Sequence, residues 1–433
     1  MNQRFTTELL GDHPALLEIS IENESAISAW VRGGEGLIGF GEYKRFVLSG
    51  PERFEKARAW WRNELQNFDI ENNVLGSGTG PILFSSFAFS ETEDSVLIIP
   101  NVVIGERKGK SWISWIGNKP QPRLSQISTV KKPLELRWSG SNGVEWQARV
   151  SQAIAEIKDN SLEKVVLARF IDCEVTPQIS AQRILQNLAA EYPATWIFSN
   201  NGLVGATPEL LVRLSKSLVT SRILAGTIRK TGNDEKDLAL AGSLARSSKD
   251  LEEHEYAVRS VADLLAPICT STNVPETPFV LHLANVMHLA TDVTGVLTDS
   301  ASPTDIFELA NKLHPSAAVC GTPTPLAKKT INDIEGISRG RYAGPIGWID
   351  ARGDGELGIA LRCGQISNDA KSIRLFAGCG IVNGSNPESE YAESQAKLLP
   401  MPLANSLAFL PRLDALNLAD CNAVGLGGPR GTA

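Results

Sequence analysis

The stretch GPIGWIDARGDGELGIALRCGQIS, residues 344–367, and the stretch KSIRLFAGCGIV, residues 371–382, decide the fold. Both are rich in the apolar and β-branched residues that strands favour. The glycine-rich segment ARGDGE, residues 351–356, interrupts the first stretch and predicts a tight hairpin between two strands. We therefore expect this part of the chain to form antiparallel strands.

The rest of the chain extends this pattern, because predicted strands outnumber predicted helices and often follow each other directly. That order favours an α+β fold with antiparallel sheets over a doubly wound parallel sheet. A loop is expected at residues 316–325. Helices are expected at residues 51–65, 144–160, 179–192, 233–266 and 303–315, and further strands at residues 33–46, 81–90, 94–107, 163–175, 194–200, 203–214 and 282–297.

The chain divides into three predicted parts. Residues 1–135 form the N-terminal half of the fold, and residues 140–402 form the catalytic half. The polar, proline-containing segment 117–135 is typical of a linker. Residues 403–433 are expected to form a C-terminal helix and a mobile, glycine-rich tail.

Composition limits the classes of function. The chain has 433 residues, is 42% hydrophobic and 21% charged, and carries a formal net charge of -7, which is typical of a globular enzyme. The negative balance, without a basic patch, argues against a nucleic-acid or anionic-membrane partner. No segment approaches the roughly 18 apolar residues of a membrane helix. The N-terminus also lacks the apolar stretch of a signal peptide, so we expect a cytoplasmic protein.

Cysteine and histidine spacing does not indicate a zinc site. The six cysteines form no CxxC pair, and the five histidines show no HExxH spacing. Scattered thiols of this kind are typical of a reducing cytosol.

Two acidic segments are the most informative features outside the strands. SSKDLEEHEYAV, residues 247–258, contains Asp250 and Glu253, and SNPESEYAESQAKL, residues 385–398, contains Glu390 and Glu393 followed by Lys397. Each carboxylate pair is about one helical turn apart. The alternatives are a solvated acidic helix and an exposed ion pair between Glu393 and Lys397.

The phase of the first acidic helix favours a buried site. At about 100° per residue, Asp250 falls inside the apolar arc and Glu253 at its margin, and a carboxylate there needs a compensating cation. Two such helices facing each other would form the oxygen cage that Mg²⁺ prefers. The arc consists of Leu251, Ala257, Val258, Val261, Leu264 and Leu265.

Two residues are candidates for acid–base chemistry. Lys164 opens the predicted strand 163–175, where a desolvated lysine binds its proton less tightly and can act as a base. Glu209, in GATPELL, precedes an apolar strand, where a carboxyl keeps its proton and can act as a general acid. The alternatives are a strand-end lysine in solvent and a turn-exposed glutamate.

Glycine-flanked segments could hold an anion. LAGTIRKTG, residues 224–232, provides Gly226 and Thr227. FAGCGIV provides Gly378 and Gly380, where missing side chains let backbone N–H groups approach a carboxylate. Arg362, one hairpin away, could donate to the same carboxylate. A bulge and a surface arginine are the alternatives.

The ordered set of motifs resembles the chorismate-utilising enzymes over at least residues 140–400, and the segments GEGLIGFGE and FSSFAFS resemble the N-terminal half of that family. The resemblance implies a layered antiparallel β-sandwich with helices on the outside and chorismate as the substrate, bound between the layers. The motifs are EKVVLAR, GATPELL, LAGTIR, SKDLEEHE, LHPSAAVCGTP, YAGPIGW, LRCGQI, FAGCGIV and ESEYAESQAKL.

The resemblance also implies roles for individual positions. Glu253 and Glu393 match Mg²⁺ ligands, while Asp250 and Glu390 match the acidic partners that hold metal-bound water. The metal in this family holds the ring carboxylate of the substrate. Substrate-contacting positions of the family correspond to Gly226, Thr227, His288, Ala318, Tyr342, Arg362, Gly378 and Lys397. For His288 the alternative is a histidine packed within a strand.

Lys164 and Ala318 decide the choice among family members. Lys164 resembles members that use water, so the resemblance implies that it activates water to attack ring carbon C2 while Glu209 protonates the departing C4 hydroxyl. Salicylate synthases share both residues but carry a threonine where Ala318 stands. Isochorismate synthase, feeding menaquinone or siderophore biosynthesis, is therefore the favoured prediction. Salicylate synthase and a non-catalytic chorismate-binding subunit are the alternatives.

Two positions depart from the family pattern. Cys379 stands where alanine is common, and Asp250 is shorter than the glutamate of some members. The presence of Lys164 also implies that no glutaminase subunit is needed, and related water-using members imply a monomer.

Overall fold

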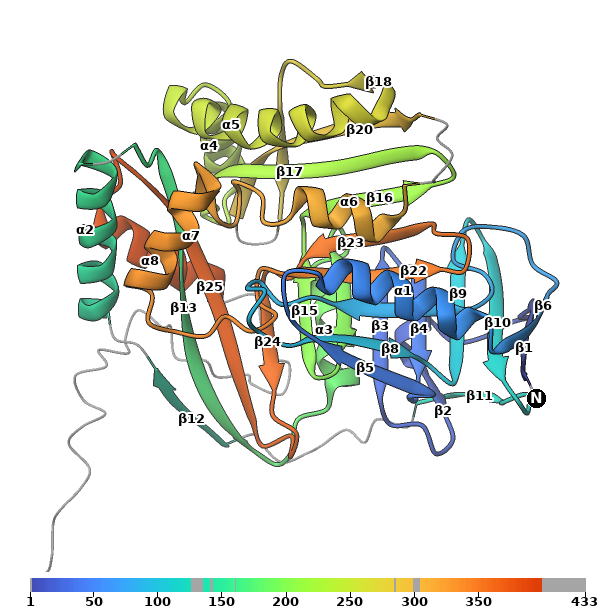
Figure 1. The fold of residues 1–433 in the computed structure, drawn as a ribbon. Helices are drawn as coiled ribbons and strands as arrows, with labels where there is room; N and C mark the ends of the chain where they lie inside the picture. The colour runs from blue at the N-terminus through green and yellow to red at the C-terminus, as the bar shows by residue number, and fades with distance from the viewer. Residues whose placement is uncertain are drawn as a thin grey trace, which may run out of the picture.

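The computed structural model describes residues 2–125, 135–140, 143–159, 161–283, 286–298 and 304–398. Two large sheets face each other and the helices lie outside them, as Figure 1 shows. The predicted α+β sandwich is therefore confirmed. The expected C-terminal helix and tail, residues 403–433, lie outside the described residues, as do residues 126–134 of the expected linker.

The first sheet is antiparallel except where β1 runs parallel to β6. It carries β21 (Gly321–Thr322) as a short partner of β13. In spatial order its strands are β12 (Glu135–Gly140), β13 (Lys164–Thr176), β25 (Ser372–Val382), β24 (Cys363–Ile366), β15 (Leu203–Thr207), β14 (Trp196–Asn200), β3 (Ile27–Arg32), β4 (Glu35–Phe40), β9 (Val102–Arg107), β10 (Lys110–Ile116), β1 (Gln3–Leu9) and β6 (Phe68–Asn72).

The second sheet is antiparallel, and β19 (Phe279–His282) pairs with β20. A separate small pair joins β2 (Ile19–Ile21) and β11 (Pro122–Leu124). In spatial order the second sheet contains β18 (Cys269–Asn273), β20 (Val286–Leu297), β17 (Leu218–Arg229), β16 (Leu210–Ser215), β23 (Gly355–Ile359), β22 (Pro345–Asp350), β7 (Ile82–Ser86), β8 (Ser95–Ile99) and β5 (Lys44–Leu48).

Both sheets combine strands from before residue 135 with strands from after residue 140. The two predicted halves therefore share one sandwich, and the boundary between them stays a prediction.

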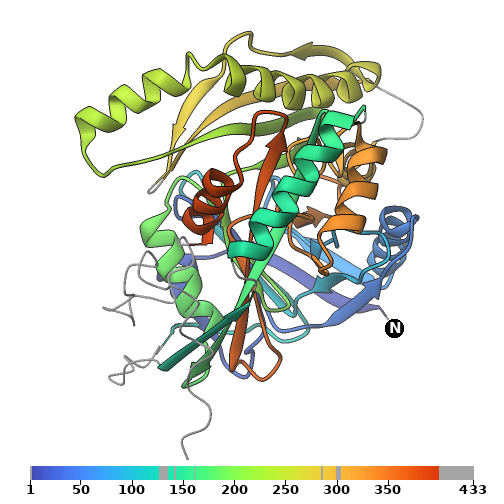
Figure 2. The same ribbon diagram turned by 90° about the vertical axis from the view of Figure 1, so that its left-hand side faces the viewer.

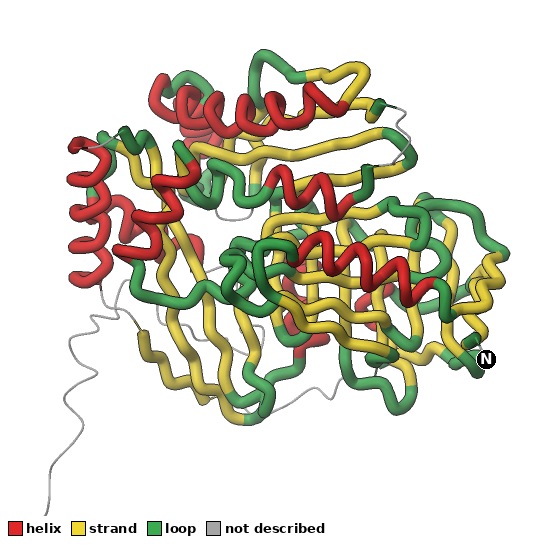
Figure 3. Tube along the Cα trace, in the orientation of Figure 1, coloured by secondary structure: helices red, strands yellow, loops and turns green. Residues whose placement is uncertain are grey.

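The helices cover the outside of the sandwich, as the red segments in Figure 3 show. In Figure 2, α8 lies below α4 and α5, and α2 packs against α8. The helices are α1 (Arg53–Leu65), α2 (Gly143–Asp159), α3 (Ala181–Glu191), α4 (Asp234–Leu244), α5 (Ser248–Leu265), α6 (Ile306–Leu313), α7 (Thr324–Ile334) and α8 (Pro387–Leu398), with single 3-10 turns at Leu16–Glu18 and Ala266–Ile268.

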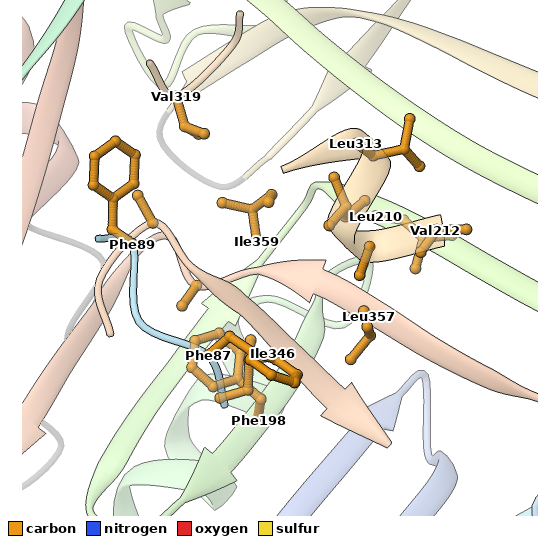
Figure 4. Packing of buried hydrophobic residues seen from close by; sticks show 14 of the residues in the cluster. Phe87, Phe89, Phe198, Leu210, Val212, Leu313, Val319, Ile346, Leu357 and Ile359 are labelled. Carbon is orange, nitrogen blue, oxygen red and sulfur yellow. The ribbon is translucent and has the colours of Figure 1, made fainter. Parts of the chain in front are cut away.

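The main core lies between the sheets. Strand β3 alternates as a strand covered on both faces should, because Trp30 joins this core while Ala29 and Val31 join a second cluster that α3 covers. Figure 4 shows part of the main core, to which Phe198 of the first sheet and Leu357 of the second contribute. The Trp30 indole N–H also donates to Glu356 at 2.9 Å.

The hairpin predicted at residues 344–367 is confirmed, since β22 and β23 pair around the turn. The next strand, β24, belongs to the first sheet, so the chain crosses between the sheets at residues 360–362. A second crossing splits the stretch 203–214, which we expected to stay together. Here β15 and β16 lie in different sheets, separated by Pro208 and Glu209.

Several predicted elements need correction. The helical stretch 233–266 is two helices, because Ser247 caps α5 by accepting a hydrogen bond from the Asp250 N–H at 3.3 Å. The expected loop 316–325 contains β21 and the start of α7, and the expected linker 117–135 contains β11. The strands β17, β18 and β19 were not predicted. Leu264 is 42% exposed, although we placed it on the buried arc, because it lies at the edge of that arc.

Candidate active site

One cavity lies where α5 and α8 meet the long strands of both sheets. It brings together all fourteen residues predicted from the sequence, although they are spread over more than 230 positions of the chain. These residues are Lys164, Glu209, Gly226, Thr227, Asp250, Glu253, His288, Ala318, Tyr342, Arg362, Gly378, Glu390, Glu393 and Lys397.

Glu209 lies at the crossing between β15 and β16, where the chain leaves one sheet for the other. Its side chain is 6% exposed. Burial raises the pKa of Glu209 to about 8, although Lys164, Arg362 and Lys397 act in the opposite direction. The carboxyl therefore holds a proton at neutral pH, as a general acid must.

Lys164 is the first residue of β13 and is 5% exposed. Its Nζ lies 2.7 Å from Glu253 Oε1, so β13 and α5 meet in a buried ion pair. Gly380 leaves room for this pair, because a Cβ there would lie 3.0 Å from both Glu253 Oε1 and Lys164 Cε. The sequence suggested a desolvated lysine here and did not predict its partner.

His288 connects Arg362 to the segment that carries Gly226 and Thr227. The Arg362 Nη2 group lies 3.0 Å from His288 Nε2, and a guanidinium can only donate, so Nε2 accepts. The proton of a neutral ring is then on Nδ1, which lies 3.1 Å from Thr227 Oγ1 and 3.3 Å from the Gly226 carbonyl. Burial, together with the charges of Arg362 and Lys397, lowers the pKa of His288 well below its usual value, so the ring is neutral.

Arg362 lies at the crossing between β23 and β24, where the chain also passes from one sheet to the other, and adopts a left-handed backbone conformation with φ of 48°. Its Nη1 is buried and has no hydrogen-bond partner among the described residues. A buried guanidinium nitrogen without a partner costs free energy unless an anion accepts from it. Arg362 is thus a donor available to a substrate carboxylate.

Another part of the cavity wall is formed by Tyr342, Phe376, Gly378 and Lys397, which make close contacts with one another. Tyr342 and Phe376 stack with ring centroids 5.0 Å apart. Gly378 is needed beside them, because a Cβ there would lie 2.9 Å from the Tyr342 hydroxyl oxygen. Lys397 Nζ donates to the Gly378 carbonyl at 2.9 Å and lies 2.5 Å from Glu393 Oε1.

Gly226 allows α5 to approach the second sheet. It has a φ of +73°, and a Cβ there would lie 3.1 Å from Cβ of Asp250. Both the backbone conformation and the contact favour glycine. The sequence predicted Gly226 as an anion contact, and the structure adds this packing role.

The donor atoms of Glu390, Glu393 and Cys379 lie within 4.8 Å of one another. Burial, followed by the charge of Glu393, raises the pKa of the Cys379 thiol well above its usual value, so this thiol is not a thiolate. The remaining donors are carboxylate oxygens, which suit a hard divalent cation. Asp250 and Glu253 of α5 line the same cavity.

Sequence reasoning missed a buried ion pair beside the site. Arg339 Nε lies 2.9 Å from Glu335 Oε2, and Arg339 also donates to the carbonyls of Val166 and Val319. Glu335 in turn accepts from the Ala168 N–H at 2.7 Å. The pair joins β13 to the loop that carries Ala318. In the sequence, only the i,i+4 spacing of Glu335 and Arg339 indicated that the two side chains could pair.

Comparisons with known proteins agree with this geometry. A model of the family described as chorismate binding enzyme matches residues 23–404. The chain is 38% identical over 414 residues to the isochorismate synthase MenF of Bacillus subtilis, covering 84% of each protein. It is 36% identical over 334 residues to the isochorismate synthase DhbC of the same organism, covering 74% of this chain and 80% of the relative.

A solved structure supports the same family assignment. The putative 2,3-dihydroxybenzoate-specific isochorismate synthase DhbC of Bacillus anthracis superposes with a TM-score of 0.74 at 32% identity, covering 90% of this chain and 98% of that one. None of the helices in the described part of the chain has the length and apolar character that crossing a membrane would need.

Proposed function

Because the chain belongs to the chorismate-binding enzyme family, we propose that it is an isochorismate synthase, which converts chorismate to isochorismate. The observation that carries the proposal is the pairing of two functional groups in one cavity: a buried lysine, Lys164, and a buried carboxyl that keeps its proton, Glu209. A water-using isomerisation needs one group that accepts a proton and another that donates one.

The two groups divide the reaction between them. Lys164 accepts a proton from water as the water oxygen bonds to ring carbon C2. The two ring double bonds shift, the bond between C4 and its hydroxyl oxygen breaks, and Glu209 gives its proton to that oxygen, which leaves as water. Because the Glu209 side chain is buried, its proton is retained at neutral pH until the oxygen needs it.

Arg362 would bind a carboxylate of the substrate. Its buried Nη1 is available, while Nη2 is engaged by the neutral His288 ring. His288 therefore holds the guanidinium in place without adding charge. An arginine fixed in this way loses less conformational freedom when it binds an anion.

We propose Mg²⁺ as the cofactor. Glu253 and Glu393 would hold the ion directly, with Asp250 and Glu390 binding the water molecules around it. The support is the all-carboxylate donor set on α5 and α8 beside a thiol that stays protonated. When bound, a divalent cation would hold the ring carboxylate of chorismate and offset its charge.

The test of the function is a product assay. Purified protein is incubated with chorismate, with and without Mg²⁺, and the products are separated by chromatography with mass detection. A Mg²⁺-dependent isomer with the mass of chorismate is expected. Salicylate and pyruvate would identify the alternative, a salicylate synthase, and would mean that Ala318 is not decisive. Unchanged chorismate would favour a non-catalytic chorismate-binding subunit.

We further propose that the enzyme is a cytoplasmic monomer that works without a glutaminase subunit and feeds menaquinone or siderophore biosynthesis. The five cysteines within the described residues are free thiols, which suits a reducing compartment. Light scattering after gel filtration measures the oligomeric state. Turnover with water alone, without ammonium or a partner protein, tests the independence from a glutaminase.

A further inference from the structure

A second cavity opens on the side of Lys164 that faces α5 and the end of β25. Its volume is about 420 Å³, far more than the roughly 30 Å³ that one water molecule occupies. It is lined by Glu163, Lys164, Glu252, Glu253, Tyr256, Thr322, Val382, Asn383 and Gly384.

The second cavity and the active-site cavity share two lining residues, Lys164 and Glu253. These two form the buried ion pair with 2.7 Å between Nζ and Oε1. The ion pair is therefore part of the wall of both cavities. A water molecule in the second cavity would lie beside this ion pair and outside the active-site cavity.

The two cavities differ in charge. Beyond the shared pair, the second cavity has Glu163 and Glu252 as its charged side chains, and both are exposed. The active-site cavity has side chains of both signs, because Arg339, Arg362 and Lys397 line it together with the carboxyl groups of Glu209, Asp250, Glu390 and Glu393. Like charges repel, so the acidic opening disfavours an anionic substrate but does not hinder neutral water.

We propose that the second cavity is the route by which water reaches Lys164 while chorismate occupies the active site. This inference rests on the proposed function, because it assumes a water molecule that Lys164 activates. The substrate binds in the active-site cavity, where Arg339, Arg362 and Lys397 lie, and water enters from the second cavity past Glu163 and Glu252. Tyr256 on α5 and the turn at Asn383 and Gly384 form the rim that controls the passage.

Gly384 is suited to a blocking experiment. A Cβ at Gly384 meets no atom within 4 Å, and its φ is not in the left-handed range, so Gly384→Trp adds bulk at the rim without backbone strain. Asn383→Trp, at a neighbouring exposed position, is a second blocking variant. Gly11→Trp is the matched control, because Gly11 is also exposed, open and unstrained but lies far from the rim in the sequence.

Steady-state kinetics give the first readout. Both blocking variants should lower kcat about tenfold while the KM for chorismate stays unchanged, because they slow water entry and leave substrate binding intact. Gly11→Trp should match the unmodified protein. Unchanged kcat in both blocking variants would overturn the proposal, and a rise in KM alone would mean that the second cavity serves the substrate.

Chemical labelling gives a readout that does not depend on turnover. In a Glu209→Gln background saturated with chorismate, Lys164 is methylated with formaldehyde and a mild reductant, and the modification is measured by peptide mass spectrometry. We expect chorismate to leave the labelling rate of Lys164 largely intact and Gly384→Trp to reduce it. Complete protection by chorismate alone would show that no second route exists.

The two proposals fail in different ways. If Lys164→Ala kept normal turnover, the proposed role of Lys164 would be wrong, whatever the rim variants did. If Lys164→Ala were inactive while the rim variants had normal kcat and normal labelling, only the water route would be wrong.

Discussion

Glu209→Gln is the sharpest perturbation that the site offers. Glutamine keeps the size of the side chain and its fit at the crossing between β15 and β16, but it has no proton to give to the departing oxygen. The loss of a general acid lowers the rate by about 10²–10⁴-fold. We expect kcat to fall by that factor, with little change in the KM for chorismate.

The raised pKa of Glu209 gives the same prediction a pH dependence. With a pKa of about 8, roughly nine-tenths of Glu209 is protonated at pH 7 and roughly one-tenth at pH 9. Because we propose that only the protonated form is active, kcat should fall about tenfold between these two pH values. The residual activity of Glu209→Gln should not show this decline.

The assay is the rate of isochorismate formation from pH 6 to pH 10 at saturating chorismate and Mg²⁺. Glu276→Gln, which changes an exposed loop glutamate, is the control and should follow the unmodified protein. If Glu209→Gln retained full activity, or if the activity of the unmodified enzyme did not fall between pH 7 and pH 9, Glu209 could not be the acid.

Glu209 also links stability to pH. Its folded pKa is raised from 4.5 to about 8, so the folded state binds more protons than the unfolded state between these values. The contribution of this group to stability is therefore complete below about pH 4.5 and is lost as the pH rises through 8, by roughly 4–5 kcal/mol. Relative to the unmodified protein, Glu209→Gln should become more stable as the pH rises through this window, as measured by denaturant titrations. If the difference in unfolding free energy between the two proteins did not change with pH, Glu209 could not be a buried acid with a raised pKa.

Three further substitutions test the rest of the site. Lys164→Ala should abolish turnover while circular dichroism shows an intact fold, and normal activity would remove its role as a base. Glu393→Gln should shift the Mg²⁺ titration to much higher concentrations, whereas an unchanged titration would disprove the proposed metal ligands. Arg339→Met should destabilise the protein by about 3–5 kcal/mol in denaturant unfolding because it leaves Glu335 buried without its partner, and a loss below about 1 kcal/mol would refute that reading of the pair.

The sequence was most informative where chemistry and local pattern coincide. The hairpin at residues 344–367 and the acidic spacing in α5 and α8 are local signals, so they could be predicted. The helix α7 was missed because residues 316–325 contain glycine and prolines. Pro323 and Pro325 at the start of the helix were nevertheless a usable signal.

Contacts between distant segments could not be predicted in the same way. Glu209 and Arg362 each lie where the chain passes from one sheet to the other, and apolar patterning continues across both crossings. The pairing of Lys164 with Glu253 joins positions 89 residues apart, and the approach of Cys379 to Glu390 and Glu393 joins a strand to a helix. Such proximity depends on the sheet order, which no local pattern contains.

In the proposed reaction, water attacks C2 while the original C4 hydroxyl leaves. The origin of the C2 oxygen is tested most directly by running the reaction in water enriched in oxygen-18 and locating the label in isochorismate by mass spectrometry. We predict that every product molecule carries one labelled oxygen, in the C2 hydroxyl group. Unlabelled isochorismate would show that the hydroxyl migrates from C4 without exchange, and would contradict the assignment of Lys164 as the base that activates water.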